Sequence, residues 1–169
     1  MGISIGSECY ISPSSVFSGD VAVGNRVAVM HNAVLRGDFN LIEIGDDSNV
    51  QDNVSIHVEA SNPCIVGRGV SIGHNAIVHG CVIGHDVLVG MGAIIMNGSN
   101  IGSGSVIGAG TLLTAGFTCP ENSLVIGSPG KVIRSGQEVA EMAKKNAASY
   151  SALRERYISG EFDVLTGHR

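Results

Sequence analysis

Apolar residues recur at every sixth position along most of this 169-residue chain. The first run extends in steps of six from Ile5 to Leu35, and the last from Ile83 to Leu113. Six is neither the helix period of 3.6 residues nor the strand period of two. A six-residue repeat predicts a parallel β-helix in which each unit is a short strand plus a turn. Three units then form one coil, and the apolar residues stack in ladders inside an all-β prism.

Composition supports this architecture and excludes several functions. Glycine accounts for 24 residues, about twice its usual share of ~7%, and suits tight corners because it accepts positive φ. Charged residues make up only 15% of the chain, so we expect part of the surface to be buried in an oligomer. The net charge of −5, without a basic patch, argues against nucleic acid. No apolar stretch is long enough for a membrane span, and cysteines without C-x-x-C pairing predict a reduced, cytoplasmic protein.

The repeat stops near Ile133, where helical spacing of apolar residues begins. Ser135 and Glu138 have the S-x-x-E form of a capping box, and Gly160 supplies a stop. The sequence therefore predicts a helix of about 23 residues. Its length of ~34 Å matches the height of a prism of roughly seven coils. We expect a β-helix over residues 1–134, a C-terminal α-helix over 135–160 packed along it, and a frayed tail over 161–169.

Three histidines have the spacing of a shared metal site. His57 and His79 are 22 residues apart, which is one 18-residue coil plus a four-residue insertion near residues 59–63. They are therefore expected to stack on adjacent coils and to share one ion. His74 lies five residues before His79, about 16 Å away in an extended chain, so a neighbouring subunit must supply it. Three imidazoles with an open fourth position are typical of catalytic zinc.

The segments 49–57, 72–81 and 89–93 closely resemble the γ-class carbonic anhydrases. The similarity includes their short, hexapeptide-repeat relatives, which are ferripyochelin-binding-protein-like and lack the acidic loop, and it covers nearly the whole chain. It implies a left-handed β-helix and a homotrimer that binds Zn²⁺, with Fe²⁺ or Co²⁺ as alternatives, at His57, His74 and His79. The implied activity is reversible hydration of CO₂ to bicarbonate by a metal-bound hydroxide at trimer interfaces.

The resemblance also implies roles for other polar residues. Asn49 and Gln51 match residues that hydrogen-bond the metal-bound water or the substrate. Three more residues match interface residues near the metal, namely Arg36, Asp38 and Asp52. They have either a catalytic role or a structural role in a salt-bridge network that holds the trimer together.

At other positions the sequence departs from the family. Tyr150 matches a helix tyrosine that reaches into the site, but the family's nearby asparagine falls on Ala152. The glutamate that serves as the family's proton shuttle falls on Phe39. His85 and Glu59 are the candidate substitutes for that glutamate.

Two further histidines, His31 and His168, have no partner that the sequence identifies. Two alternative functions also remain open. A CoA-dependent acyltransferase would use the same repeat fold with one histidine as a general base and no metal triad. A metal-binding structural trimer would keep the triad but show little or no turnover. Bound metal separates the first alternative from the carbonic anhydrase, and a hydration assay separates the second.

Overall fold

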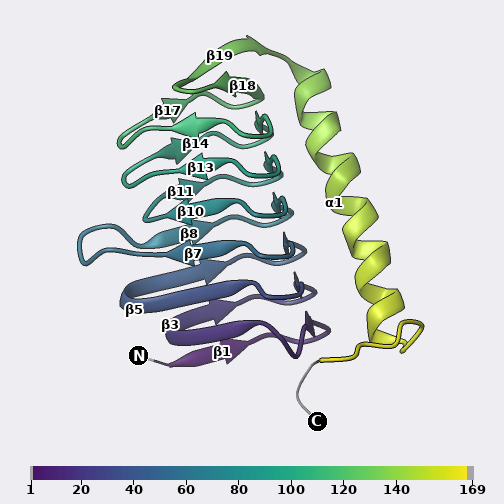
Figure 1. Ribbon diagram of the computed structural model, residues 1–169. Helices are drawn as coiled ribbons and strands as arrows, with labels where there is room; N and C mark the ends of the chain where they lie inside the picture. Colours follow the sequence, from purple (N-terminus) through teal and green to yellow (C-terminus); the bar gives the residue numbers. More distant parts are fainter. Residues whose placement is uncertain (1, 167–169) are drawn as a thin grey trace.

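The computed structural model describes residues 2–166 as a left-handed parallel β-helix of about seven turns with one C-terminal helix. Figure 1 shows the coils stacked as a prism, with the helix α1 running along its outside. Strands of successive coils pair in parallel, whereas the β18–β19 hairpin at one end is antiparallel. The six-residue period therefore predicted the fold class correctly.

Two sheets form the walls of the prism. The first is an eight-stranded sheet that contacts α1. Its strands are β2 (Tyr10–Ile11), β4 (Ala28–Val29), β6 (Asn49–Val50), β9 (Ser71–Ile72), β12 (Leu88–Val89), β15 (Val106–Ile107), β18 (Ser123–Gly127) and β19 (Gly130–Ser135).

The second sheet has eleven strands and supplies the other two walls, because its long strands β3 and β5 continue from one wall into the next. Its strands are β1 (Ile3–Ile5), β3 (Val16–Val23), β5 (Val34–Ile44), β7 (Ser55–His57), β8 (Cys64–Val66), β10 (Ile77–His79), β11 (Val82–Ile83), β13 (Ile94–Ile95), β14 (Asn100–Ile101), β16 (Leu112–Leu113) and β17 (Thr118–Cys119).

The interior consists of apolar ladders, as the period predicts. Val78 pairs with Ile56 on one side and with Ile95 on the other, and all three side chains are buried. Ile5 departs from the expected pattern, since it is 45% exposed. It lies in β1, which pairs only with β3 at the end of the prism and so has no coil beneath it.

Turns of successive coils stack in columns at the corners of the prism. One column, here called the His74 corner, contains the turns at His31, Asp52, His74 and Met91. Backbone N–H groups join these turns at 2.9–3.0 Å, from Asn53 to the His31 carbonyl, from Asn75 to Asp52 and from Gly92 to His74. Residues far apart in sequence, such as His31 and His74, therefore lie on one edge of the molecule.

A second column, the His57 corner, contains the turns that follow β7 and β10. The Gly80 N–H donates to the His57 carbonyl at 3.0 Å, and the Gly98 N–H donates to the Gly80 carbonyl at 2.8 Å. The loop between β7 and β8 extends from this corner, where the four-residue insertion was predicted. Strand β10 runs from the His74 corner to the His57 corner, so the two corners are one strand apart.

The helix α1 spans Gln137–Ile158 and packs against the first sheet through Val139 and Ala143, both fully buried. Its start differs from the prediction, because the expected capping box does not form. Gly136 is the N-cap without a side-chain cap, and the Ser135 hydroxyl lies 3.1 Å from that of Ser123 instead. No helix within residues 2–166 is long and apolar enough to cross a membrane.

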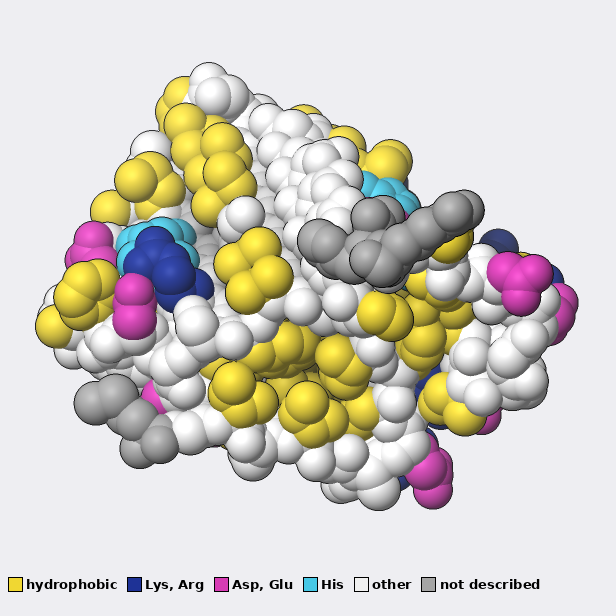
Figure 2. Space-filling view, turned by 60° about the horizontal axis from the view of Figure 1, so that its bottom comes forward, with side chains coloured by type: hydrophobic (Ala, Val, Ile, Leu, Met, Phe, Trp, Pro, Cys, Tyr) yellow, Lys and Arg dark blue, Asp and Glu magenta, His cyan; other side chains and the backbone are white. Residues whose placement is uncertain are grey.

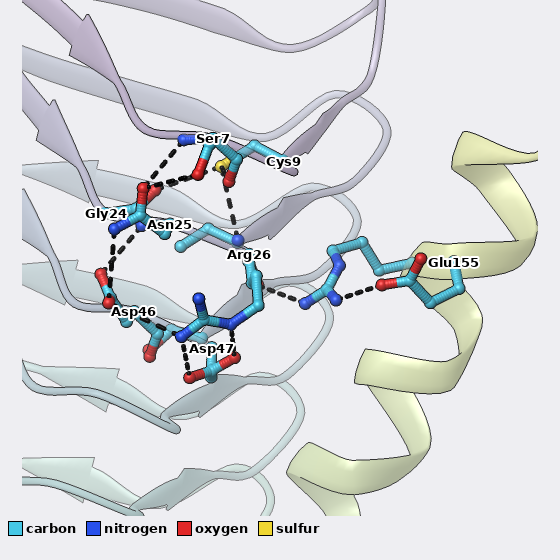
Figure 3. A network of polar contacts seen from close by, with 11 residues as sticks. Ser7, Cys9, Gly24, Asn25, Arg26, Asp46, Asp47 and Glu155 are labelled. Carbon is cyan, nitrogen blue, oxygen red and sulfur yellow. Dashed lines mark hydrogen bonds and ion pairs between the residues drawn. The ribbon is translucent and has the colours of Figure 1, made fainter.

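A polar network fastens the C-terminal half of α1 to the prism (Figure 3). The Arg154 guanidinium is 95% buried and donates to the Arg26 carbonyl at 2.6 Å. The Arg26 side chain in turn donates twice to Asp47, at 2.7 and 2.8 Å. These hydrogen bonds from Arg26 hold the pKa of Asp47 below its usual range. The network sets the height of α1 along the prism and hence the position of Tyr150.

Within the tail expected over residues 161–169, Glu161 and Phe162 contact the helix. Glu161 accepts two hydrogen bonds from Arg156, and the Phe162 ring lies 4.8 Å from that of Tyr157. His168 lies outside the described residues.

Candidate metal centre

His57 and His79 pair in register on adjacent coils, as their spacing predicts. Nδ1 of His57 lies 3.0 Å from Nε2 of His79, and the ring centroids are 4.9 Å apart. Both residues are half-buried at the ends of β7 and β10. Figure 2 shows histidine and arginine side chains gathered on one edge of the molecule beside acidic ones.

The remaining ring nitrogens of this pair face hydrogen-bond acceptors. Nε2 of His57 lies 2.9 Å from the Asp38 carboxylate, and Nδ1 of His79 contacts the Asn97 side-chain oxygen. An acceptor on one nitrogen places the proton there and leaves a lone pair on the other. In the tautomers that these acceptors favour, the two facing nitrogens both present lone pairs, which is the arrangement of two ligands to one cation. Their 3.0 Å separation fits two ligands that each bind zinc at about 2.0–2.1 Å.

The Asp38 carboxylate is held by two hydrogen-bond donors, His57 on the neighbouring coil and Arg36 on its own strand. Although partial desolvation favours its protonated form, hydrogen bonds from His57 and Arg36 keep the pKa of Asp38 below its usual range. The Arg36 guanidinium lies 2.5 Å from Asp38 within the same chain. Gly37 between them permits close packing, since a Cβ there would lie 2.3 Å from the Asp20 carbonyl oxygen.

His74 has the same kind of support at the other corner. Its Nδ1 lies 2.7 Å from the Asp52 carboxylate, which leaves the Nε2 lone pair available, and the Tyr150 hydroxyl lies 3.2 Å from that Nε2. Within residues 2–166 of one chain, no group of three or more His, Cys, Asp or Glu residues is arranged to hold a metal ion. His57 and His79 thus supply two nitrogens from one corner, whereas His74 points outward from another.

Buried amides support the His74 turn from below. The Gln51 side-chain oxygen accepts the His74 backbone N–H at 3.2 Å, and the Gln51 amide donates to Asn49 at 3.1 Å. Asn49 donates onward to the Ser71 hydroxyl at 2.8 Å. All three of these supporting side chains are almost fully buried. Gln51 and Asn49 thus fix the backbone that carries His74, and their contact with a metal-bound water or substrate stays a prediction.

Tyr150 borders a cavity of about 330 Å³ between α1 and the prism. Burial raises the pKa of Tyr150, and the charge of Asp52 adds to this shift, so the hydroxyl stays protonated and can donate. The lining is mostly apolar with a few polar groups. It consists of Gln51, Gly73, His74, Leu88, Val89, Gly90, Met91, Ala109, Asn146 and Tyr150.

Asn146 is a residue of this cavity that the sequence analysis missed. It lies one helical turn before Tyr150, and its side-chain oxygen is buried without a hydrogen-bond partner within the described residues. The comparison with the family had pointed to Ala152, after the tyrosine. The signal that identifies Asn146 is its i, i+4 relation to Tyr150, which places both side chains on one face of the helix.

Phe39 occupies the position of the family's shuttle glutamate and lies beside the histidine pair. It is 65% exposed, and its ring centroid is 5.9 Å from that of His57. Of its candidate substitutes, Glu59 lies in the loop after His57, where its backbone bridges to Asn62. His85 lies at the third corner, where its Nδ1 accepts the Arg68 N–H at 3.1 Å, away from both histidine corners.

Comparisons with known proteins identify the class to which this fold and site belong. The family model for the bacterial transferase hexapeptide (six repeats) matches residues 80–115. A Methanocaldococcus jannaschii protein named "Probable carbonic anhydrase" is 47% identical over 152 residues, which cover 89% of this chain and 96% of that protein. The chain belongs to the γ-class carbonic anhydrase-like family of hexapeptide-repeat proteins.

Two other similarities extend this result. Gamma carbonic anhydrase 1, mitochondrial, from Arabidopsis thaliana is 39% identical over 85 residues, which cover 47% of this chain and 31% of the plant protein. The crystal structure of a hexapeptide transferase family protein from Anaplasma phagocytophilum superposes with a TM-score of 0.79 at 32% identity. That similarity covers 90% of this chain and 96% of the other.

Proposed function

We propose that this protein is a homotrimeric, metal-dependent carbonic anhydrase that hydrates CO₂ reversibly to bicarbonate. His57 and His79 of one subunit and His74 of the next would hold one divalent cation, Zn²⁺ or alternatively Fe²⁺ or Co²⁺. The observation that carries the proposal is the shared orientation of the three imidazoles. Each directs one nitrogen to a carboxylate or amide acceptor and leaves the other free as a ligand.

The chain's own residues would position the reactants. When bound, a divalent cation supplies Lewis-acid activation of water near neutral pH. Asp38, Asp52 and Asn97 would orient the ligand imidazoles and fix their tautomers, as in other histidine metal sites. The charge of Arg36 keeps Asp38 ionised and so maintains this orientation.

The cavity beside His74 suits a small, apolar, linear substrate. Leu88 and Met91 supply apolar walls, which favour CO₂ over water. The Tyr150 hydroxyl and the Asn146 amide can donate hydrogen bonds toward the oxygen atoms of CO₂ or bicarbonate. Gln51 contributes by fixing the His74 turn and also lines this cavity.

A trimer is supported by the wall between the two histidine corners. Its outward side chains are apolar and exposed next to His79, and they include Ile77, Ile94 and Met96. Exposed apolar side chains also appear beside the histidine and arginine group in Figure 2. A contiguous apolar wall is typical of a protein interface. The four cysteines are all free thiols, which supports a cytoplasmic location.

Metal analysis of anaerobically purified protein, followed by a CO₂ hydration assay, tests this function. We expect about one divalent ion per chain, a trimeric mass and hydration that requires the ion. The double variant His57→Ala/His79→Ala should lose both metal and activity. Metal at full stoichiometry in that variant, or a metal-loaded trimer without activity, would contradict the proposal, and the second result would favour the structural trimer.

One observation favours a second candidate, a CoA-dependent acyltransferase. The similarity to the hexapeptide transferase family protein covers nearly the whole chain. An acyltransferase would bind CoA and acetylate an acceptor after all metal had been removed by a chelator. A carbonic anhydrase would lose its activity under the same treatment, so a single chelation experiment separates the two functions.

A further inference from the structure

His31 belongs to a polar cluster that the metal centre does not use. Its Nδ1 lies 2.7 Å from the Ser12 hydroxyl, and its Nε2 lies 3.4 Å from the Tyr157 hydroxyl. The Tyr157 ring is fixed by stacking on Tyr10, with ring centroids 4.4 Å apart. The sequence had offered no partner for His31, because Ser12 is one coil away and Tyr157 is on the distant helix.

The same cluster opens on a cavity of about 640 Å³ at the end of the prism that carries the N-terminus. Its lining includes Ser14, His31, Asn32, Tyr157 and Asp163. The His31 ring is half-buried, so one side contacts protein while another reaches this open space. An imidazole so placed can exchange protons with solvent molecules or buffers.

His31 is also connected to His74 along the same corner. The Asp52 carboxylate accepts the His31 backbone N–H at 3.3 Å and lies 2.7 Å from Nδ1 of His74. On the helix, Tyr150 contacts His74 and Tyr157 contacts His31. These tyrosines are seven residues apart, or about 10.5 Å along one helix face. His31 therefore lies at the same corner as His74, with the Asp52 turn between them.

Reversible hydration requires a route for one proton, since CO₂ and water give bicarbonate and H⁺. The three ligand histidines cannot take it, because their free nitrogens face the cation. Phe39, which lies beside His57, has no group that accepts a proton. A nearby weak base must therefore accept the proton before it reaches solvent.

We propose that His31 is this base, an inference that rests on the carbonic anhydrase function proposed above. With its Nδ1–H donating to Ser12, the Nε2 lone pair faces Tyr157 and the cavity. Nε2 takes up the proton released at the metal centre and gives it to a buffer molecule in the cavity. The ring returns to its neutral form, so the chain undergoes no net change.

Polar and acidic groups surround His31 on both the prism side and the helix side. Asp52 faces it from the turn after β6, and Asp163 lines the cavity from the segment after α1. The other groups that face it are hydroxyls, from Ser12 on the prism and Tyr157 on the helix. Two carboxylates, those of Asp52 and Asp163, thus lie near the His31 residue.

The substitution His31→Ala in the metal-loaded trimer tests the assignment. At low buffer concentration we expect kcat to fall about tenfold or more, while kcat/KM and metal content stay unchanged. Added imidazole should restore kcat, because a small base can replace the missing ring. His85→Ala is the matched control, since it removes a histidine from the third corner and should leave kcat unchanged.

A second measurement does not depend on activity. Diethylpyrocarbonate modifies accessible imidazoles, so mass spectrometry of the intact assembly should find His31 modified, with His85 as the reference for an exposed ring. An unmodified His31 would overturn the proposal, because a buried ring cannot pass protons to buffer. If the wild type is active and His31→Ala has the same kcat, the role of His31 is overturned but the carbonic anhydrase function stands. If the metal-loaded wild type is inactive, the carbonic anhydrase function is overturned as well.

Discussion

The Asp52 carboxylate lies 2.7 Å from Nδ1 of His74, and the opposite ring nitrogen lies 3.2 Å from the Tyr150 hydroxyl. The Asp52 contact favours the tautomer that the proposed role of His74 as a metal ligand requires. Removing the charge while keeping the shape therefore isolates the contribution of the carboxylate. We expect Asp52→Asn to lower metal affinity about 10–100-fold, as other substitutions of this kind do.

Competition with a chromophoric chelator measures this affinity. Asp86→Asn is the matched control, because Asp86 lies at another corner near Lys144, at 4.0 Å. Equal affinities in the two variants would show that Asp52 serves the subunit interface and does not orient His74.

The proposed division of metal ligands between subunits gives a second prediction. His74→Ala and His79→Ala homotrimers should each lack metal, since each removes one ligand from every site. When the two proteins are unfolded together and reassembled, some interfaces should combine an intact His74 with an intact His57 and His79. Metal analysis and hydration assays should therefore detect partial recovery only in the mixture. No recovery in verified mixed trimers, or full metal binding by a monomer, would contradict a shared site.

The fold was predictable because each coil repeats the same physical requirement. An apolar side chain must enter the prism every six residues, and the pattern from Ile83 to Leu113 records this without interruption. The ends were less predictable. Ile5 has the repeat pattern but lacks a coil beneath it, and Ser135 bonds to Ser123 where a helix cap was expected.

The histidine pair was predictable for the same reason, since residues one coil apart in a β-helix must be neighbours. Contacts between the prism and α1 could not be predicted this way. The position of Asn146 over the cavity and of Tyr157 beside His31 depends on how far α1 is shifted along the prism. That shift is set by the buried Arg154 contact with the Arg26 carbonyl, which no repeat pattern encodes.

Asn146 provides a third prediction, about substrate. Its side chain lines the cavity next to Tyr150, and the side-chain oxygen has no hydrogen-bond partner within the described residues, so Asn146→Ala should weaken the orientation of CO₂ without removing a metal ligand. We expect kcat/KM to fall about tenfold, in line with the loss of one hydrogen bond of about 1–1.5 kcal/mol. Ser149→Ala is the control, because Ser149 is exposed on the same helix and bonds only to its own helix backbone. Equal kinetics in both variants, with metal content unchanged, would remove Asn146 from the site.

The last prediction concerns pH and the attachment of α1. Hydrogen bonds from Arg26 lower the folded-state pKa of Asp47 below its unfolded value of about 3.9. The stabilisation is therefore fully present above that value and is lost as the pH falls through the folded-state pKa. Urea unfolding should show Asp47→Asn to be less stable than wild type at pH 7, with the difference shrinking below about pH 4. Asp20→Asn, at a half-buried position of β3 whose carboxylate accepts the Gly2 N–H at 3.2 Å, should show a smaller difference at pH 7, because no arginine is hydrogen-bonded to Asp20 within the described residues. A difference between Asp47→Asn and wild type that stays constant down to pH 3 would show that the Arg26 contact does not stabilise the folded protein through charge.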